Sequence, residues 1–328
     1  MDVEEEGDEG LLEFDNWFDG VELGIIPPIP TPRTEDQQPQ RYIAGCKWDS
    51  EDYSCPYDAY LMCFWSLYEQ SSATWRNEWI RHSENWNIPL SNNFDHLILL
   101  TDSPTNTRDL TAWFSHYRNS LRKQLSDADP RSFPRNGPVL ASASRILGVT
   151  FGRITGPYLE QNLTCSECGM STMAQIDTRY VMHGRGRDRR TASLQVVWEQ
   201  FVERHSESPF GQQAKCDCCE GQNRVEGLRM PETPWIWFER QRRSPVEPSP
   251  SLTFNSPSQQ LRYSLQSAIY TGERHFTARF RDQSGAWWKH DGKIASGVPQ
   301  LDDIQSGAEL LSNDDKFACI FVYRRDYD

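Results

Sequence analysis

One apolar stretch constrains this chain more than any other feature. The residues from Ala59 to Tyr68 are apolar on nearly every face of a helix, so a helix here must be covered on all sides. The stretch follows Cys55 and Pro56, and proline suits the first helical position because its missing N–H is not needed there. Asp58 lies one turn further on, where a carboxylate faces the positive end of the helix dipole. The sequence therefore predicts a buried helix that begins at Cys55.

The thiol of Cys55 has two interpretations. A thiol at a helix N-terminus experiences a partial positive charge that favours the thiolate, which is the nucleophilic form. A free cysteine inside a protein more often serves as a small buried apolar residue. The stretch by itself leaves both interpretations open, so the rest of the chain must decide between them.

The acidity of the chain belongs to its first forty residues. The 328 residues carry a formal charge of −13, and residues 1–40 hold twelve acids against Arg33 alone, which leaves only −2 for the remainder. That acidic, proline-containing segment cannot bury enough apolar surface to fold, so we expect a disordered tail over 1–40 and a folded domain over 41–328. The near-neutral body argues against general nucleic-acid binding by charge.

The same composition predicts where the protein works. No run of eighteen apolar residues suggests a membrane span, and the acidic N-terminus argues against a signal peptide. Nine cysteines in an intracellular chain are expected to be thiols or metal ligands rather than disulfides. We therefore expect an intracellular protein of the cytoplasm, the nucleus or both, without a membrane partner.

The chain divides into a helical half and a half rich in strands. Helical periodicity predicts helices over 73–86, 106–124 and 139–149 and an amphipathic run over 193–202. Alternating patterns predict strands over 235–240, 263–270, 274–281, 286–289 and 317–323, which we expect to form a twisted antiparallel sheet. The Ser- and Pro-rich segment 244–260 between them is expected to be a flexible loop.

Two cysteine knuckles indicate a metal site. Cys165 and Cys168 form one Cys-x-x-Cys pair, and Cys216 and Cys219 form a second pair after 47 intervening residues. Four thiolates can hold a tetrahedral zinc ion and leave no position open, so the predicted zinc is structural. Cys218 is a spare thiol that could replace one of the four ligands.

An arginine-rich loop raises a different interpretation of this module. Arg185, Arg187, Arg189 and Arg190 alternate with glycine and aspartate between the two knuckles. A solvated surface loop is the favoured interpretation. A zinc ribbon that binds nucleic acid is the alternative, and it would require salt-sensitive binding to DNA or RNA.

A predicted hairpin brings a histidine and an aspartate together. The turn Asp282-Gln283-Ser284-Gly285 joins two strands, and a hairpin centred on it places His275 opposite Asp291 or Gly292. Directly opposed residues lie about 5 Å apart at Cβ, which allows a hydrogen bond between these side chains. A carboxylate bonded to one ring nitrogen fixes the imidazole tautomer and leaves the other nitrogen free as a base. With Cys55, this pair would complete a Cys-His-Asp arrangement.

These motifs, in this order, resemble the ubiquitin-specific proteases. The resemblance spans Gly45 to Arg325. It rests on Ser54-Cys55 with Asp58, the two knuckles, Pro234-Trp235-Ile236-Trp237-Phe238-Glu239-Arg240, the segment His275-Phe276-Thr277-Ala278 preceded by Tyr263–Tyr270, the segment Trp287–Asp291 and the closing strand Phe317–Arg324. The resemblance implies an α+β, papain-like cysteine peptidase fold with fingers–palm–thumb architecture. Its helical half would come first, its antiparallel sheet second, and its zinc-binding fingers would span about 155–230.

The resemblance also implies an activity and its residues. It makes Cys55 the nucleophile, His275 the base and Asp291 its orienting partner in a thiol-dependent deubiquitinase. Such an enzyme hydrolyses the isopeptide bond at the C-terminal glycine of ubiquitin or a ubiquitin-like modifier, and its zinc takes no part in the chemistry.

The chain departs from the family pattern beside the nucleophile. Five residues before the cysteine the family usually has an asparagine that donates to the oxyanion, and here Ser50 is the candidate donor, among Asp49, Glu51 and Asp52. Loss of one oxyanion donor typically lowers turnover about a hundred- to a thousandfold. The alternative interpretation is therefore a weak or inactive relative that binds ubiquitin as a scaffold.

Overall fold

A computed structural model describes the second of the two units into which the chain divides, Tyr42–Asp328. The described residues are 44–82, 84–101, 107–137, 141–150, 158–179, 181–183, 192–209, 214–256 and 259–327. The tail predicted over 1–40 and most of the arginine-rich loop lie outside them, so both remain predictions.

The helices precede most of the sheet along the chain. They are α1 (Cys55–Glu69), α2 (Ala73–His82), α3 (Glu84–Thr101), α4 (Thr107–Ala128), α5 (Ala143–Thr150) and α6 (Leu194–Glu207), with short 3-10 turns η1 (Val181–His183), η3 (Ala295–Gly297) and η4 (Ala308–Leu311). None of the helices within the described ranges is long and apolar enough to cross a membrane.

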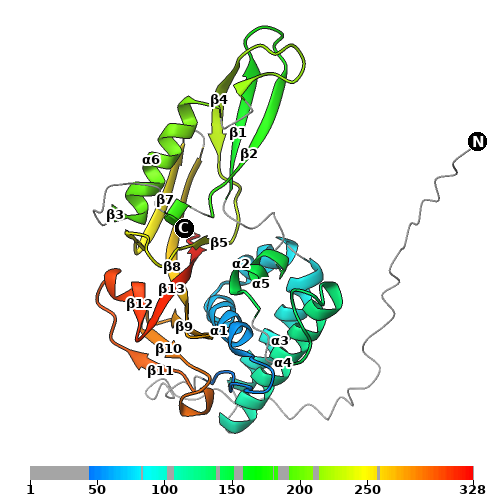
Figure 1. The fold of residues 1–328 in the computed structure, drawn as a ribbon, viewed down its shortest axis with the longest axis vertical. Helices are drawn as coiled ribbons and strands as arrows, with labels where there is room; N and C mark the ends of the chain where they lie inside the picture. Colours follow the sequence, from blue (N-terminus) through cyan, green and yellow to red (C-terminus); the bar gives the residue numbers. More distant parts are fainter. Residues whose placement is uncertain are drawn as a thin grey trace, which may run out of the picture. The chain divides into compact units, whose positions relative to one another are not determined.

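Helix α1 is buried as its sequence predicts. Every residue from Cys55 to Tyr68 is buried, and the helix packs against strand β9 on one side and other helices on the other (Figure 1). The Trp65 ring meets Phe94 of α3 and Phe114 of α4, with centroids 5.7 and 5.6 Å away. Edge contacts of this kind add to the energy of apolar burial. Helix α1 therefore joins the helices to the sheet.

The strands form a large sheet and two smaller ones. They are β1 (Tyr158–Cys165), β2 (Ser171–Asp177), β3 (Ala192–Ser193), β4 (Asn223–Arg229), β5 (Trp235–Glu239), β6 (Val246–Glu247), β7 (Ser251–Ser256), β8 (Gln259–Gly272), β9 (His275–Arg281), β10 (Trp287–His290), β11 (Gln300–Asp302), β12 (Ser312–Asn313) and β13 (Lys316–Arg325). The large antiparallel sheet has the order β11-β10-β9-β8-β13-β12, with β5 paired to β13 and β7 to β8. An antiparallel sheet of order β2-β1-β4 stands apart from it, and β3 pairs in parallel with β6.

The large sheet separates two hydrophobic cores. Along β5, Trp235 and Trp237 belong to the core around α1, whereas Ile236 and Phe238 belong to the core beneath α6. Successive side chains of a strand point to opposite faces, so one short strand contributes to both cores. Both faces of the sheet are covered, which explains why β5 is apolar without alternation.

The mixed α+β character and the antiparallel sheet are confirmed, while three boundaries are corrected. The helix predicted over 73–86 is two helices, α2 and α3, and the extension of α3 to Thr101 was not predicted. The segment 244–260 is not simply a loop, because it contains β6 and β7. Leu252 and Phe254 alternate with polar residues there and are buried against β8, a pattern that the serines and prolines around it concealed.

Candidate active site and metal centre

Cys55 begins α1 and is almost fully buried, with 2% of its surface exposed. Its sulfur accepts a hydrogen bond from the backbone N–H of Phe276 on β9. Burial, together with the charge of the nearby Asp58, raises the pKa of Cys55 to about 12, although the Phe276 N–H and the charge of Lys293 oppose the increase. The expectation that the helix terminus favours a thiolate is therefore not met in this state, because burial outweighs the helix dipole.

His275 and Asp291 are in direct contact. Nε2 of His275 lies 2.7 Å from Oδ1 of Asp291, and both side chains are more than nine-tenths buried. The same Oδ1 accepts the backbone N–H of Lys293 at 2.9 Å. Burial alone would raise the pKa of Asp291, but these hydrogen bonds outweigh it and lower the pKa below its ordinary value.

The bond to Asp291 determines what the other ring nitrogen can do. With Nε2–H donating to the carboxylate, Nδ1 of His275 is left as a proton acceptor. Nδ1 is buried and has no hydrogen-bond partner among the described residues, Cys55 included. The base is thus oriented, while the thiol is hydrogen-bonded to the neighbouring backbone instead of to the imidazole.

The hairpin register differs from the predicted one. Trp287 pairs with Arg281 and His290 with Ala278, so the loop between the strands is centred on Ser284. Gly285 in this loop has a φ of +85°, which favours glycine. With this register Lys293, not Asp291, would face His275 if the strands continued. The contact forms because β10 ends at His290 and Asp291 begins a turn closed by the Ile294 N–H.

A buried ion pair supports the loop before the nucleophile. Nη1 of Arg118 on α4 donates to Oδ1 of Asp58 at 3.1 Å and to the Lys47 carbonyl at 2.6 Å. The Ser54 hydroxyl donates to the other carboxylate oxygen of Asp58 and accepts the Asp49 N–H, at 2.7 and 2.8 Å. Burial raises the pKa of Asp58 to about 6, although Arg118 and Ser54 oppose the increase. Asp58 is thus the centre of a network, beyond the dipole role that its position predicts.

The acids around Ser50 are engaged in the same loop. The Asp49 carboxylate accepts the backbone N–H groups of Glu51 and Asp52, and the Asp52 carboxylate accepts the Gly137 N–H. Arg122, one turn beyond Arg118 on α4, donates to the Asp52 carbonyl. Ser50 itself is exposed in the turn. Its assignment as oxyanion donor remains a prediction.

Several residues of this site had no role predicted from the sequence. The segment 45–48 crosses residues 290–297 at backbone contact, where Trp48 N–H donates to the Gly292 carbonyl at 3.0 Å and His290 Nε2 lies 3.0 Å from the Cys46 carbonyl. A Cβ on Gly297 would come within 2.3 Å of that carbonyl oxygen. For Arg118 and Arg122 a signal existed: both lie on the apolar stripe of α4, where a basic residue needs a buried partner.

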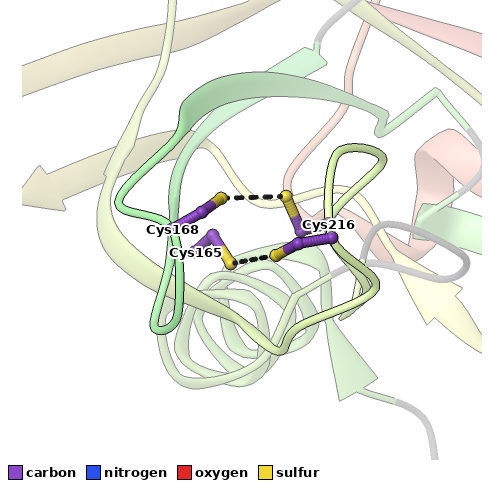
Figure 2. A group of neighbouring side chains, drawn as sticks. Cys165, Cys168 and Cys216 are labelled. Carbon is purple, nitrogen blue, oxygen red and sulfur yellow. Dashed lines mark hydrogen bonds between the residues drawn. The ribbon is translucent and has the colours of Figure 1, made fainter.

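The four predicted zinc ligands come together. The sulfurs of Cys165, Cys168, Cys216 and Cys219 lie within 4.8 Å of one another, at the end of the β2-β1-β4 sheet. The sulfurs form two facing pairs, Cys168 with Cys216 at 3.7 Å and Cys165 with Cys219 at 3.5 Å. Figure 2 labels Cys165, Cys168 and Cys216 of this group. A tetrahedral zinc with bonds of about 2.3 Å spaces its sulfurs about 3.8 Å apart, so the donor set fits the ion.

The surroundings of the sulfurs fit a metal as well. The backbone N–H groups of Glu167 and Cys218 each lie 3.4 Å from a cluster sulfur, an arrangement that stabilises thiolates. A Cβ on Gly221 would lie 3.0 Å from the Cys165 sulfur, so this close approach favours glycine. The thiol of Cys218 is exposed and is not part of the group of four.

Comparisons with known proteins add a distant structural likeness. No family model matches the sequence, and no curated protein matches it. A solved structure of the DUB module of SAGA, formed by Ubp8, Sgf11, Sus1 and Sgf73, aligns with 92% of this chain and 71% of that chain at 13% identity and a TM-score of 0.48. A likeness at this level carries no argument about activity or partners, so the function must be argued from the site.

Proposed function

We propose that the protein is a thiol-dependent deubiquitinase with a papain-like fold, in which α1–α5 form the thumb, the large sheet the palm and the β2-β1-β4 sheet the zinc-bearing fingers. The observation that carries the proposal is the 2.7 Å bond between His275 Nε2 and Asp291, which leaves Nδ1 free beside the strand that holds the Cys55 thiol. Nucleophile, base and orienting acid come from three separate segments, as in other Cys-His-Asp sites.

The reaction follows from these positions. Nδ1 of His275 takes the thiol proton of Cys55 while the sulfur attacks the carbonyl carbon of the modifier's C-terminal glycine. The resulting oxyanion collapses, the bond to the lysine nitrogen breaks, and His275 returns the proton to the leaving amine. Water then attacks the thioester, with His275 again acting as base, and releases the modifier and the free thiol.

The productive geometry requires a change of hydrogen-bond partner at the Cys55 sulfur. The Cys55 sulfur must exchange the Phe276 N–H for Nδ1 of His275, whose hydrogen-bonding position is vacant. Catalytic hydrogen bonds are often long or unmade in the absence of substrate and form in the complex. Zinc would be held by the four clustered cysteines and would stabilise the fingers that contact the modifier.

The test is covalent labelling by ubiquitin that carries a C-terminal electrophile. We expect the wild type to be labelled at Cys55 and Cys55→Ala to remain unlabelled. Cys218→Ser is the matched control, because it removes an exposed thiol outside the metal cluster and should not change labelling. Failure of a folded, zinc-loaded wild type to react would contradict the proposal.

A ubiquitin-binding scaffold without turnover is the second candidate. It is favoured by the burial that raises the pKa of Cys55 to about 12 and by the missing bond between the thiol and His275. Binding of di-ubiquitin without cleavage would support the scaffold, and measurable cleavage would exclude it. A nucleic-acid-binding zinc ribbon remains a prediction from the arginine-rich loop, and salt-sensitive binding is its minimum requirement.

A further inference from the structure

The indole N–H of Trp48 has no hydrogen-bond acceptor among the described residues. Trp48 lies seven residues before Cys55, and its backbone is fixed by the bond to Gly292. Nε1 is buried, and it has no hydrogen-bond partner within the part of the chain that the structure describes. A buried indole N–H normally finds an acceptor, so this donor calls for an explanation.

A second buried polar atom without a hydrogen-bond partner belongs to the side chain that the Trp48 ring contacts. The Trp48 ring meets His275 edge-on, with centroids 6.1 Å apart and planes inclined by 70°. Nδ1 of His275 is the other buried polar atom without a partner in this contact. Two touching side chains therefore present a donor and a proton-accepting nitrogen that nothing in the described structure satisfies. Such a pair matches a reaction in which an oxygen atom needs a hydrogen-bond donor and a proton needs an acceptor.

We propose that the indole N–H of Trp48 donates to the oxyanion that forms when Cys55 attacks an acyl carbon, the role that the sequence assigns to Ser50. The inference rests on the proposed function and names a further residue of the same site. In the step concerned, a bond forms between sulfur and carbon and the thiol proton moves to Nδ1 of His275. The C=O π electrons move onto oxygen, and Trp48 donates to that oxygen until collapse of the intermediate restores the carbonyl.

The charges around the site support a donor at this position. Nζ of Lys293 lies 4.2 Å from the centroid of the Trp48 ring, and a cation over an indole draws electron density from it and strengthens the N–H as a donor. Lys293 also acts on Cys55 itself, where it opposes the effect of Asp58, and Arg118 forms an ion pair with Asp58 at 3.1 Å. The charge of Lys293 therefore acts both on the Trp48 ring and on the Cys55 thiol.

Access follows from the same contacts. Nε1 of Trp48 and Nδ1 of His275 are both shielded from solvent, so any acyl group that reaches the base must separate the surfaces that cover them. The two rings are in contact, so both atoms belong to the same buried region beside the nucleophile loop. Ser50, by contrast, is exposed in a turn at the start of the nucleophile loop.

The first experiment does not depend on recognition of ubiquitin. N-acetylglycinal, an aldehyde that mimics a C-terminal glycine, adds to a thiol to give a hemithioacetal whose oxygen occupies the oxyanion position. In protein with 15N-labelled tryptophan, we expect the indole proton resonance of Trp48 to move downfield when Cys55 is modified. The resonance is assigned by its absence in Trp48→Phe.

The second experiment separates oxyanion stabilisation from thiol activation. Trp48→Phe keeps an aromatic ring at this position but lacks the indole N–H, and we expect kcat on a ubiquitin substrate to fall about a hundred- to a thousandfold with KM little changed. Alkylation of Cys55 by iodoacetamide forms no oxyanion, so its rate should stay close to wild type. Trp288→Phe is the matched control, because the Trp288 indole already donates to Asp282 at 2.8 Å and its loss should leave kcat unchanged.

Three results would overturn the inference: an unmoved Trp48 resonance in aldehyde-modified protein, an unchanged kcat in Trp48→Phe beside a large loss in Ser50→Ala, or no addition of the aldehyde to Cys55. Failure of the proposed function is a separate result. If the aldehyde adds and the resonance moves while ubiquitin electrophiles never label the protein, Trp48 keeps its role and the modifier is wrong.

Discussion

At the scale of single residues, the site depends on side chains that carry no chemistry themselves. Arg118 and Asp58 are both about 4% exposed or less, and together with Ser54 they fix the loop that leads to Cys55. A buried ion pair contributes little compared with apolar residues, but removing one partner leaves an uncompensated buried charge. The network therefore makes the nucleophile loop sensitive to substitutions on α4.

Arg118→Met tests this dependence. We expect the free energy of unfolding at neutral pH to fall by about 3–5 kcal/mol, because the Asp58 carboxylate loses its partner inside the protein. Adding Asp58→Asn should recover part of the loss, since no buried charge then remains. Chemical denaturation of the wild type, Arg118→Met, Asp58→Asn and the double variant gives the coupling energy. Simple additivity of the two substitutions would show that the pair does not act as a unit.

At the scale of elements, the zinc knuckles and the β2-β1-β4 sheet depend on each other. Cys165 ends β1, Cys216 and Cys219 precede β4, and the knuckles connect the strand ends. A small sheet has little hydrophobic core of its own, so its folding depends in part on the binding free energy of a metal at its end. The apolar side of this sheet is limited to residues such as Leu159, Ile176 and Leu228, which join the core beneath α6.

Metal analysis and thermal unfolding test this element. We expect one zinc per chain in the wild type, loss of the metal with a lowered Tm in Cys165→Ser, and a similar loss on chelation. Cys218→Ser is the matched control and should retain both zinc and Tm. Equal loss of zinc in Cys218→Ser would show that the Cys218 thiol is a ligand and replaces one of the four clustered cysteines.

The sequence identified the elements better than their pairing. The buried helix at Cys55, the knuckles and the strands β5, β8, β9, β10 and β13 follow from periodicity and spacing, which are local properties. The meeting of His275 and Asp291 also followed, although the predicted register was one or two residues off because the loop length was misjudged. The place of Arg118 on the apolar stripe of α4 indicated a buried partner, but not that the partner is Asp58, 60 residues away. The role of Trp48 could not follow, because an unmade hydrogen bond is a property of the tertiary structure.

At the scale of the whole molecule, burial of titratable groups links stability to pH. His290 is 1% exposed beside Asp291, and burial lowers its pKa to about 4, although the Cys46 carbonyl opposes the decrease. In the unfolded chain a histidine titrates near 6.5. The contribution of neutral His290 is therefore fully present above about pH 6.5 and is lost as the pH falls toward 4, because the unfolded state then binds the proton first.

His290→Gln should flatten this dependence. Glutamine offers an N–H donor for the Cys46 carbonyl but does not titrate in this range, so up to about 3 kcal/mol of the acid-induced loss of stability should disappear. Urea unfolding at several pH values between 4.5 and 7 measures the slope, and His116→Gln on the exposed face of α4 serves as the comparison. An unchanged slope in His290→Gln would place the acid sensitivity elsewhere.

The backbone crossing beside the catalytic residues has a consequence for how this sequence can diverge. Gly45, Gly292 and Gly297 lie where two chain segments touch, and a Cβ at any of them would come within 3 Å of a neighbouring atom. None of the three carries a functional group, yet each fixes the distance between the strand end that holds Asp291 and the segment that holds Trp48. Natural variants should therefore keep glycine at these three positions. They should accept replacement of many larger side chains elsewhere before they accept even alanine here.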